Sequence, residues 1–162
     1  MNVCLIGNGI STLILSIILA NRNIKVSIFE EKQPTRNLES RTLGISKNNY
    51  DYLKYEKINL EKKSWPIDKI KIYSENSKEI LNFESKKNKI FFIIKYTELI
   101  NILDKIEKKN KFIKKIKIRD ETFYDKIING NNSYDLIINL NENNKISKEI
   151  FYKRNEKNYN SV

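Results

Sequence analysis

The stretch that decides the fold is Met1-Asn-Val-Cys-Leu-Ile-Gly-Asn-Gly-Ile-Ser-Thr12. Val3 to Ile6 is a short apolar run typical of a buried strand. Gly7 and Gly9 follow at once, at the point where a strand has to turn sharply into a helix. The order of these residues predicts a strand, a glycine turn and the start of a helix.

The residues that follow complete the unit. Leu13 to Ala20 is almost entirely apolar and predicts a helix packed on a sheet, which Asn21-Arg22-Asn23 would end. Lys25 to Phe29 predicts a second strand, and Glu30 closes it 21 positions after Gly9. This is a βαβ unit with a glycine-rich turn and an acid at the distance found in dinucleotide-binding folds.

The chemistry of such a turn explains the residue types. Gly7 permits backbone angles that a side chain would forbid, and Gly9 has no Cβ, so a pyrophosphate can approach the main chain. The free N–H groups at the helix start attract phosphates. The Glu30 carboxylate can accept hydrogen bonds from ribose hydroxyls and would repel a 2′-phosphate, which favours an adenosine diphosphate moiety without that group.

Thr12 stands where the fingerprint has its third glycine. That glycine lets helix and strand pack closely, so Thr12 should push them slightly apart. The alternative interpretation is a plain buried βαβ unit with a glycine turn and no ligand.

Composition bounds the remaining possibilities. The chain has 162 residues, which fits one domain or one domain plus a piece of another. With 40% hydrophobic and 31% charged residues it can bury a core. The net charge of +11 suggests acidic partners, but no nucleic-acid motif appears and the lysines are spread out. We therefore interpret them as a solvated surface and expect no nucleic-acid partner.

Cys4 is the only cysteine and lies in the first strand, so there is no disulfide framework and we expect a reducing, cytoplasmic location. The chain has no histidine, so we predict neither a histidine general base nor a zinc site, and no metal. The start lacks the basic head of a signal peptide, and Ile10 to Ala20 is too short for a membrane span.

Beyond the opening unit the pattern is mixed. Gln33 to Ser40 is polar and should be a loop, and Arg41 to Ser46 is a short apolar stretch headed by an arginine. Lys47 to Tyr55 predicts a helix. Asn59 to Ser64 reads as a charged connection that Trp65-Pro66 breaks.

A different pattern follows. Ile67 to Tyr73 is a strand-like run, and Ile80 to Phe83 and Ile90 to Ile94 are two more. Polar turns at Ser74 to Ser77 and Ser85 to Asn88 separate them. Three short strands in succession predict an antiparallel meander.

The last part returns to an alternating order. Tyr96 to Lys109 has helical spacing, with Thr97 as the expected N-cap. Phe112 to Ile118 and Phe123 to Ile128 are expected to be strands, and Tyr134 to Leu140 a strand buried in the parallel sheet.

This order of elements resembles the N-terminal part of flavin-dependent aromatic-ring monooxygenases of the p-hydroxybenzoate hydroxylase superfamily, most closely the ubiquinone-biosynthesis hydroxylases. Three stretches carry the resemblance: the Gly7-Asn8-Gly9 turn with Glu30, Arg41-Thr-Leu-Gly-Ile-Ser46, and the helix entry Phe92 to Leu99. It covers most of the chain but half or less of a typical family member, so the fold should be interrupted by a small antiparallel insertion and cut short.

The resemblance implies that the first motif binds the adenosine diphosphate part of FAD and that NAD(P)H is the reductant. Arg41 would lie beside the cofactor, where its guanidinium can pair with a phosphate, although a plain surface arginine is the alternative. No catalytic side chain is nominated. The predicted cofactor-binding residues are Gly7, Gly9, Ile10, Ser11, Thr12, Glu30 and Arg41.

Several positions depart from the family. Thr97 replaces an arginine, Asn141-Glu142 stands at the Asp-Gly motif, and the later Gly-Asp motif would lie beyond Val162. The expected domains are a nucleotide-binding segment at 1–64, an antiparallel insertion at 65–94, a return to the nucleotide-binding domain at 95–148 and the start of a substrate-domain segment at 149–162.

Two functions from different classes remain. One is the FAD-binding portion of a hydroxylase acting on a small aromatic substrate, such as a ubiquinone precursor reached at a membrane surface, and incomplete without a partner chain or a C-terminal half. The other is a degenerate Rossmann-type module that binds NAD or a partner without catalysis.

Overall fold

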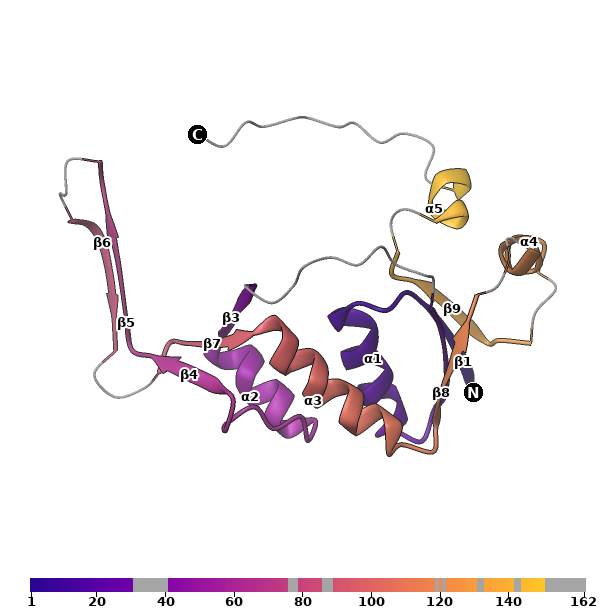
Figure 1. Cartoon of the computed structure of the whole chain (residues 1–162), viewed down its shortest axis with the longest axis horizontal. Coiled ribbons are helices and arrows are strands. Elements are labelled where there is room, and N and C mark those ends of the chain that lie inside the picture. The colour runs from indigo at the N-terminus through magenta and orange to yellow at the C-terminus, as the bar shows by residue number, and fades with distance from the viewer. Residues whose placement is uncertain are drawn as a thin grey trace. The chain divides into compact units, whose positions relative to one another are not determined.

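The computed structural model describes residues 1–30, 41–75, 79–85, 89–118, 120, 122–130, 133–141 and 144–150 (Figure 1). They divide into two compact units, one made of residues 1–33 and 111–162 and the other of residues 34–110. The chain thus leaves the first unit and later returns to it. The four domain ranges expected from the sequence stay predictions.

The first unit is built on a four-stranded parallel sheet in the order β8-β2-β1-β9. This confirms the predicted α/β class with a parallel sheet around the opening βαβ unit. The strands are β1 (Asn2–Ile6), β2 (Lys25–Glu30), β8 (Ile113–Lys117) and β9 (Leu136–Asn139). β1 lies inside the sheet, which explains why its four apolar residues are fully buried.

Helix α1 (Ile10–Ala20) packs against β1 and β2, as its apolar run predicts. Leu13 and Ile17, four residues apart, are buried. Because side chains alternate along a strand, Val3 and Leu5 share the face toward this helix, and Cys4 and Ile6 share the other.

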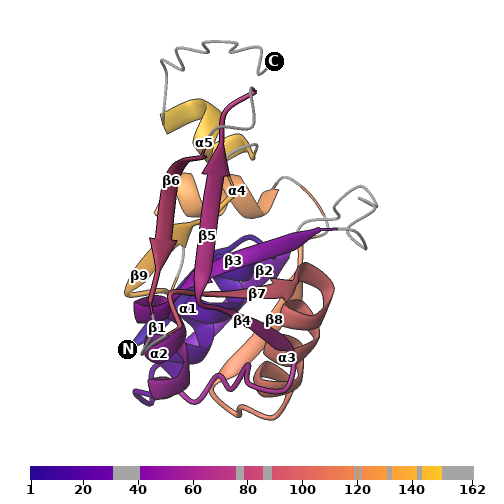
Figure 2. The ribbon, with the colours of Figure 1, turned by 90° about the vertical axis from the view of Figure 1, so that its left-hand side faces the viewer.

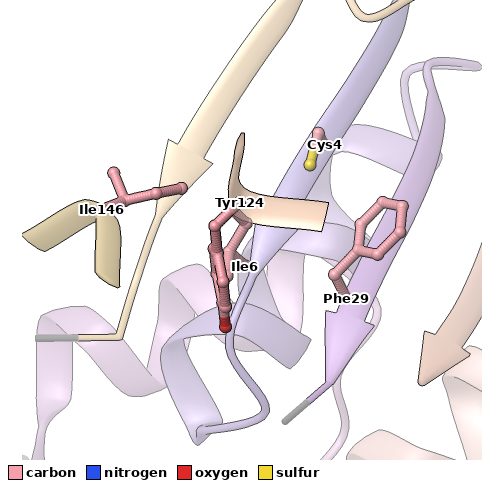
Figure 3. Close-up of a cluster of buried hydrophobic side chains, with 5 residues drawn as sticks. All are labelled: Cys4, Ile6, Phe29, Tyr124 and Ile146. Carbon is pink, nitrogen blue, oxygen red and sulfur yellow. The ribbon is translucent and has the colours of Figure 1, made fainter. Parts of the chain in front are cut away.

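The other face carries α4 (Thr122–Ile128) and α5 (Lys145–Ile150). Figure 3 shows the buried cluster that they form with the sheet, made of Cys4, Ile6, Phe29, Tyr124 and Ile146. The prediction of a strand over 123–128 is therefore wrong. Asp120 accepts a hydrogen bond from the Thr122 backbone N–H at 3.0 Å, which starts a helix that buries Tyr124 and half-buries Phe123 and Ile127.

The second unit contains an antiparallel sheet in the order β3-β7-β4. Its elements are β3 (Thr42–Ser46), α2 (Lys47–Tyr55), β4 (Ser64–Ile67), β7 (Phe91–Lys95) and α3 (Tyr96–Lys108). The rings of Tyr50 and Phe92 stack at 3.7 Å between centroids, which joins α2 to the middle strand. Trp65 and Pro66, expected to break the chain, instead form part of β4, at the edge of the sheet where proline is tolerated.

A two-stranded hairpin completes this unit, made of β5 (Lys69–Tyr73) and β6 (Glu79–Glu84), which run side by side in Figure 2. The small antiparallel insertion is confirmed, but the three-stranded meander is wrong, because β7 pairs with β3 and β4. The single strand-like run over 67–73 is likewise two strands, divided at Asp68.

The helix predicted from Tyr96 is confirmed, but its N-cap is Lys95 rather than Thr97. Thr97 lies within the first turn. In α2 the cap is Ser46, whose hydroxyl accepts a hydrogen bond from the Asn49 backbone N–H at 3.4 Å.

Burial raises the pKa of the Cys4 thiol from its ordinary value of 9.0 to about 12. The unfolded thiol ionises near pH 9 and the folded one does not, so this residue contributes stability below pH 9 that is lost as the pH rises toward 12. We expect alkylation by iodoacetamide at pH 8 to be slow until urea unfolds the protein. Rapid labelling of the folded chain would contradict this.

Candidate functional site

The sheet topology points to one place for a ligand. After β1 the chain moves outward through β2 to β8, and it returns to the opposite side of β1 with β9. The direction of the connections thus reverses between β1 and β9, and open parallel sheets bind ligands at the carboxyl ends of the strands at such a reversal. Gly7 and Leu140 are the residues that follow these two strands.

Gly7 has a conformational role in this turn. Its φ is +136°, an angle that side-chain-bearing residues rarely adopt, and a Cβ there would lie 3.0 Å from Oγ1 of Thr12 and 3.5 Å from the backbone of Leu140. Its N–H donates to the Phe29 carbonyl at 2.9 Å. Gly7 therefore sets the backbone conformation of the turn. Its N–H already donates to a carbonyl of β2.

Gly9 leaves open space at the start of α1. It is the N-cap residue, with φ −78° and ψ 174°, and a Cβ placed on it would meet nothing within 4 Å. No side chain caps the helix and its first turn has no acidic residue. The first intrahelical hydrogen bond runs from Leu13 to the Gly9 carbonyl at 3.2 Å.

The N–H groups of Ile10, Ser11 and Thr12 consequently have no acceptor inside the helix. Ser11 is exposed, Ile10 is half-buried and Thr12 is buried. These donors and the positive end of the helix dipole point to the bare main chain at Gly9, an arrangement that attracts anions. The Thr12 side chain fills the space of the third fingerprint glycine and faces the Gly7 position.

Glu30 ends β2 at the same edge of the sheet. Its Oε1 lies 3.3 Å from Nζ of Lys115 on β8, and both side chains are about a quarter exposed. Its carbonyl accepts a hydrogen bond from the Ile118 N–H at 3.0 Å. The structure therefore places Glu30 one strand away from the glycine turn, with a cation beside it that the sequence alone did not indicate.

A hollow of about 560 Å³ lies at the ends of β2 and β8. Phe29 and Phe123 stack within it at 4.3 Å between centroids. Its lining combines apolar and charged side chains: Phe29, Ile116, Lys117, Ile118, Asp120, Thr122, Phe123 and Lys126. An aromatic wall with lysines at the rim suits a flat, partly anionic ligand.

Sequence reasoning missed a polar network that follows β9. The Asn139 side-chain amide donates to Asn144 Oδ1 at 3.1 Å and to Ser147 Oγ at 2.8 Å, and the Asn144 amide donates back at 2.8 Å. Asn144 is 4% exposed and accepts from the Ser147 N–H at 3.0 Å, which caps α5. This network lies next to Asn141-Glu142, the pair that stands in place of the Asp-Gly motif. Glu142 lies outside the described residues.

Arg41 belongs to the second unit. It is exposed, precedes β3 and holds its guanidinium 5.7 Å from the centre of the Tyr96 ring. Its carbonyl accepts a hydrogen bond from the Tyr96 N–H at 2.8 Å. Its predicted place beside a cofactor stays a prediction, as do the ligand contacts of the six residues in the first unit.

Comparison with known proteins gives no match to any family model or to any curated protein. Solved structures do match. p-Nitrophenol 4-monooxygenase PnpA from Pseudomonas putida DLL-E4 superimposes with a TM-score of 0.60 at 10% identity, over 74% of this chain and 34% of that one. The chain therefore shares the fold of part of that structure.

Two more examples support this. The tetrameric form of 2-methyl-3-hydroxypyridine-5-carboxylic acid oxygenase gives a TM-score of 0.60 at 14% identity, over 72% of this chain and 31% of that one. CtdE, solved with FAD and a substrate, gives 0.55 at 23% identity, over 71% and 30%. The chain thus spans about a third of the length of these structures.

Two further observations concern the described part of the chain. No helix in it is both long and apolar enough to cross a bilayer. Nor does that part contain a group of three or more cysteine, aspartate or glutamate side chains able to hold a metal ion.

Proposed function

We propose that the first unit binds the adenosine diphosphate part of FAD. The observation that carries this proposal is the open space at Gly9, above a helix start with no side-chain cap and no acidic residue. A diphosphate would lie against Gly9 and the N–H groups of Ile10, Ser11 and Thr12. Glu30 would hold the ribose.

The residues present fit this group. A Cβ at Gly9 would occupy the space that a phosphate needs, and the Gly7 backbone angle keeps the turn tight enough for that approach. When bound, FAD supplies the electron transfer and oxygen chemistry of a monooxygenase. This unit contributes binding and orientation of the nucleotide end, and no side chain in it is assigned a proton-transfer role.

The wider activity is also a proposal. We place this chain in an NAD(P)H-dependent hydroxylase that acts in the cytoplasm on a small aromatic substrate, such as a ubiquinone precursor reached at a membrane surface. The named substrates of two matched enzymes, p-nitrophenol and a hydroxypyridine carboxylic acid, support the aromatic class. Because the chain spans about a third of such enzymes, further polypeptide from a C-terminal half or a partner would complete the site.

Titration of the purified chain with FAD, followed by flavin fluorescence, tests the binding proposal. We expect saturable quenching, with ADP competing for the same site. Saturable binding of NAD with no FAD binding would instead support the degenerate module. If neither nucleotide nor ADP binds, the proposal is wrong.

The second candidate, a module without catalysis, is favoured by one observation. Asn139, Asn144 and Ser147 satisfy one another at the end of β9, so these side chains are engaged within the protein. NAD binding needs only the turn and Glu30. Comparing the affinities for FAD and NAD separates the two candidates.

Glu30→Gln tests nucleotide selection. In the native protein the carboxylate should repel a 2′-phosphate, and Lys115 at 3.3 Å balances part of its charge. The neutral variant no longer repels a 2′-phosphate, so we expect the ratio of affinities for NAD over NADP to fall about tenfold. Competition of both nucleotides against FAD measures this ratio, and an unchanged ratio would remove Glu30 from the ribose site. Glu61→Gln, on an exposed turn of the second unit, is the matched control.

A further inference from the structure

Tyr124 has a feature that the core does not explain. The residue is 5% exposed, and its hydroxyl oxygen is buried with no hydrogen-bond partner among the described residues. Its ring meets Phe123 edge-on at 5.4 Å and belongs to the cluster with Ile6 and Ile146. A buried hydroxyl without a partner opposes folding, and phenylalanine would fill the same space without that cost.

The direction of this side chain relates it to the glycine turn. Figure 3 shows the Tyr124 ring extending from α4 next to Ile6, with its hydroxyl pointing toward the carboxyl end of β1. Gly7 follows Ile6 directly, and Gly9 then begins α1. The unpaired phenol therefore lies at the same end of β1 as the N–H groups of the first turn of α1.

We infer that the Tyr124 hydroxyl donates a hydrogen bond to an anionic oxygen of the diphosphate bound at this turn. This inference rests on the proposed nucleotide site. A phenol O–H is a good donor to a phosphate oxygen, and hydrogen bonds to charged groups are the stronger kind. Because the hydroxyl is buried, the Tyr124 ring has to shift for the hydroxyl to reach the diphosphate.

Tyr124→Phe tests the inference because a hydroxyl that pairs only with the ligand and a hydroxyl already paired in the core predict opposite changes in stability. If it is unpaired until the ligand arrives, its removal leaves the stability of the free protein unchanged or raises it. The affinity for FAD and for ADP should then fall about tenfold. Adenosine, which has no phosphate, should bind the variant as it binds the native chain. Urea unfolding without ligand and titration with each compound give these quantities.

Tyr134→Phe is the control, since Tyr134 packs edge-on to Phe29 at 5.9 Å in the same core. Its nucleotide affinity should stay native. A less stable Tyr124→Phe protein, whatever its affinity, would show that the hydroxyl already has a partner and would overturn the inference. Native affinity for ADP in that variant would also overturn it and leave the proposed function standing. If the native chain binds no nucleotide, both fail together.

Discussion

Gly9→Val is expected to lower the affinity for FAD and ADP about a hundredfold or more while the protein stays folded. The side chain would stand in open space, since a Cβ there has no neighbour within 4 Å, and the φ of −78° suits any residue. It would, however, exclude a phosphate from the main chain and from two or more N–H donors, each worth about 1.5–3 kcal/mol to a charged acceptor. Nucleotide titration and urea unfolding measure the two effects separately.

The stability cost should be small. Replacing glycine by a poorer N-cap residue lowers the free energy of unfolding by roughly 1 kcal/mol or less. Gly9→Ala should fall between the native chain and Gly9→Val in affinity, because it adds only the Cβ. If Gly9→Val binds FAD and ADP as tightly as the native chain, no diphosphate lies against this turn and the proposed function is lost.

Gly7→Ala should act on the fold itself. At φ +136° an alanine is strained, which costs about 1–3 kcal/mol, and its Cβ would also lie 3.0 Å from Oγ1 of the buried Thr12. We expect a clear drop in the urea midpoint. Any loss of nucleotide affinity at Gly7 should follow from the distorted turn, whereas at Gly9 the loss should appear with only a small change in stability.

Thr12 permits a sharper version of this experiment. In a Thr12→Ala background the close oxygen is gone, so Gly7→Ala should be less costly there, with the remainder due to backbone strain. A double-mutant cycle of the four proteins gives this coupling as a difference in unfolding free energy. Additive effects within about 0.5 kcal/mol would mean that the two residues do not crowd each other.

The opening unit could be predicted because local and global preferences agree there. The apolar run from Leu13 to Ala20 can only be a packed helix, and the strands on either side of it are buried in the sheet. Gly7 and Gly9 signalled the turn, and the sequence assigned them different roles, backbone freedom at Gly7 and space for a ligand at Gly9. The φ of +136° at Gly7 and the open space at Gly9 agree with these roles. The crowding of Gly7 by Leu140 could not be predicted, because Leu140 is more than a hundred residues away.

Other parts depended on tertiary contacts. Phe123 and Ile127 are four residues apart, a spacing that suits a helix, yet the β-branched and aromatic residues between 123 and 128 also suit a strand. The Asp120 contact and the apolar face of the sheet decide the outcome. Helix α5 was missed, although Asn144, two residues before the apolar Ile146, is a recognisable N-cap signal.

The position of β9 has a consequence for how the protein is made. Its residues 136–139 pair with residues 3–6 of β1, so the central strand has one side without a partner until nearly the whole described chain has left the ribosome. Contacts between such distant residues form slowly, because a long loop must close first. A nascent chain that pauses during the intervening insertion would therefore present a bare apolar strand edge to chaperones.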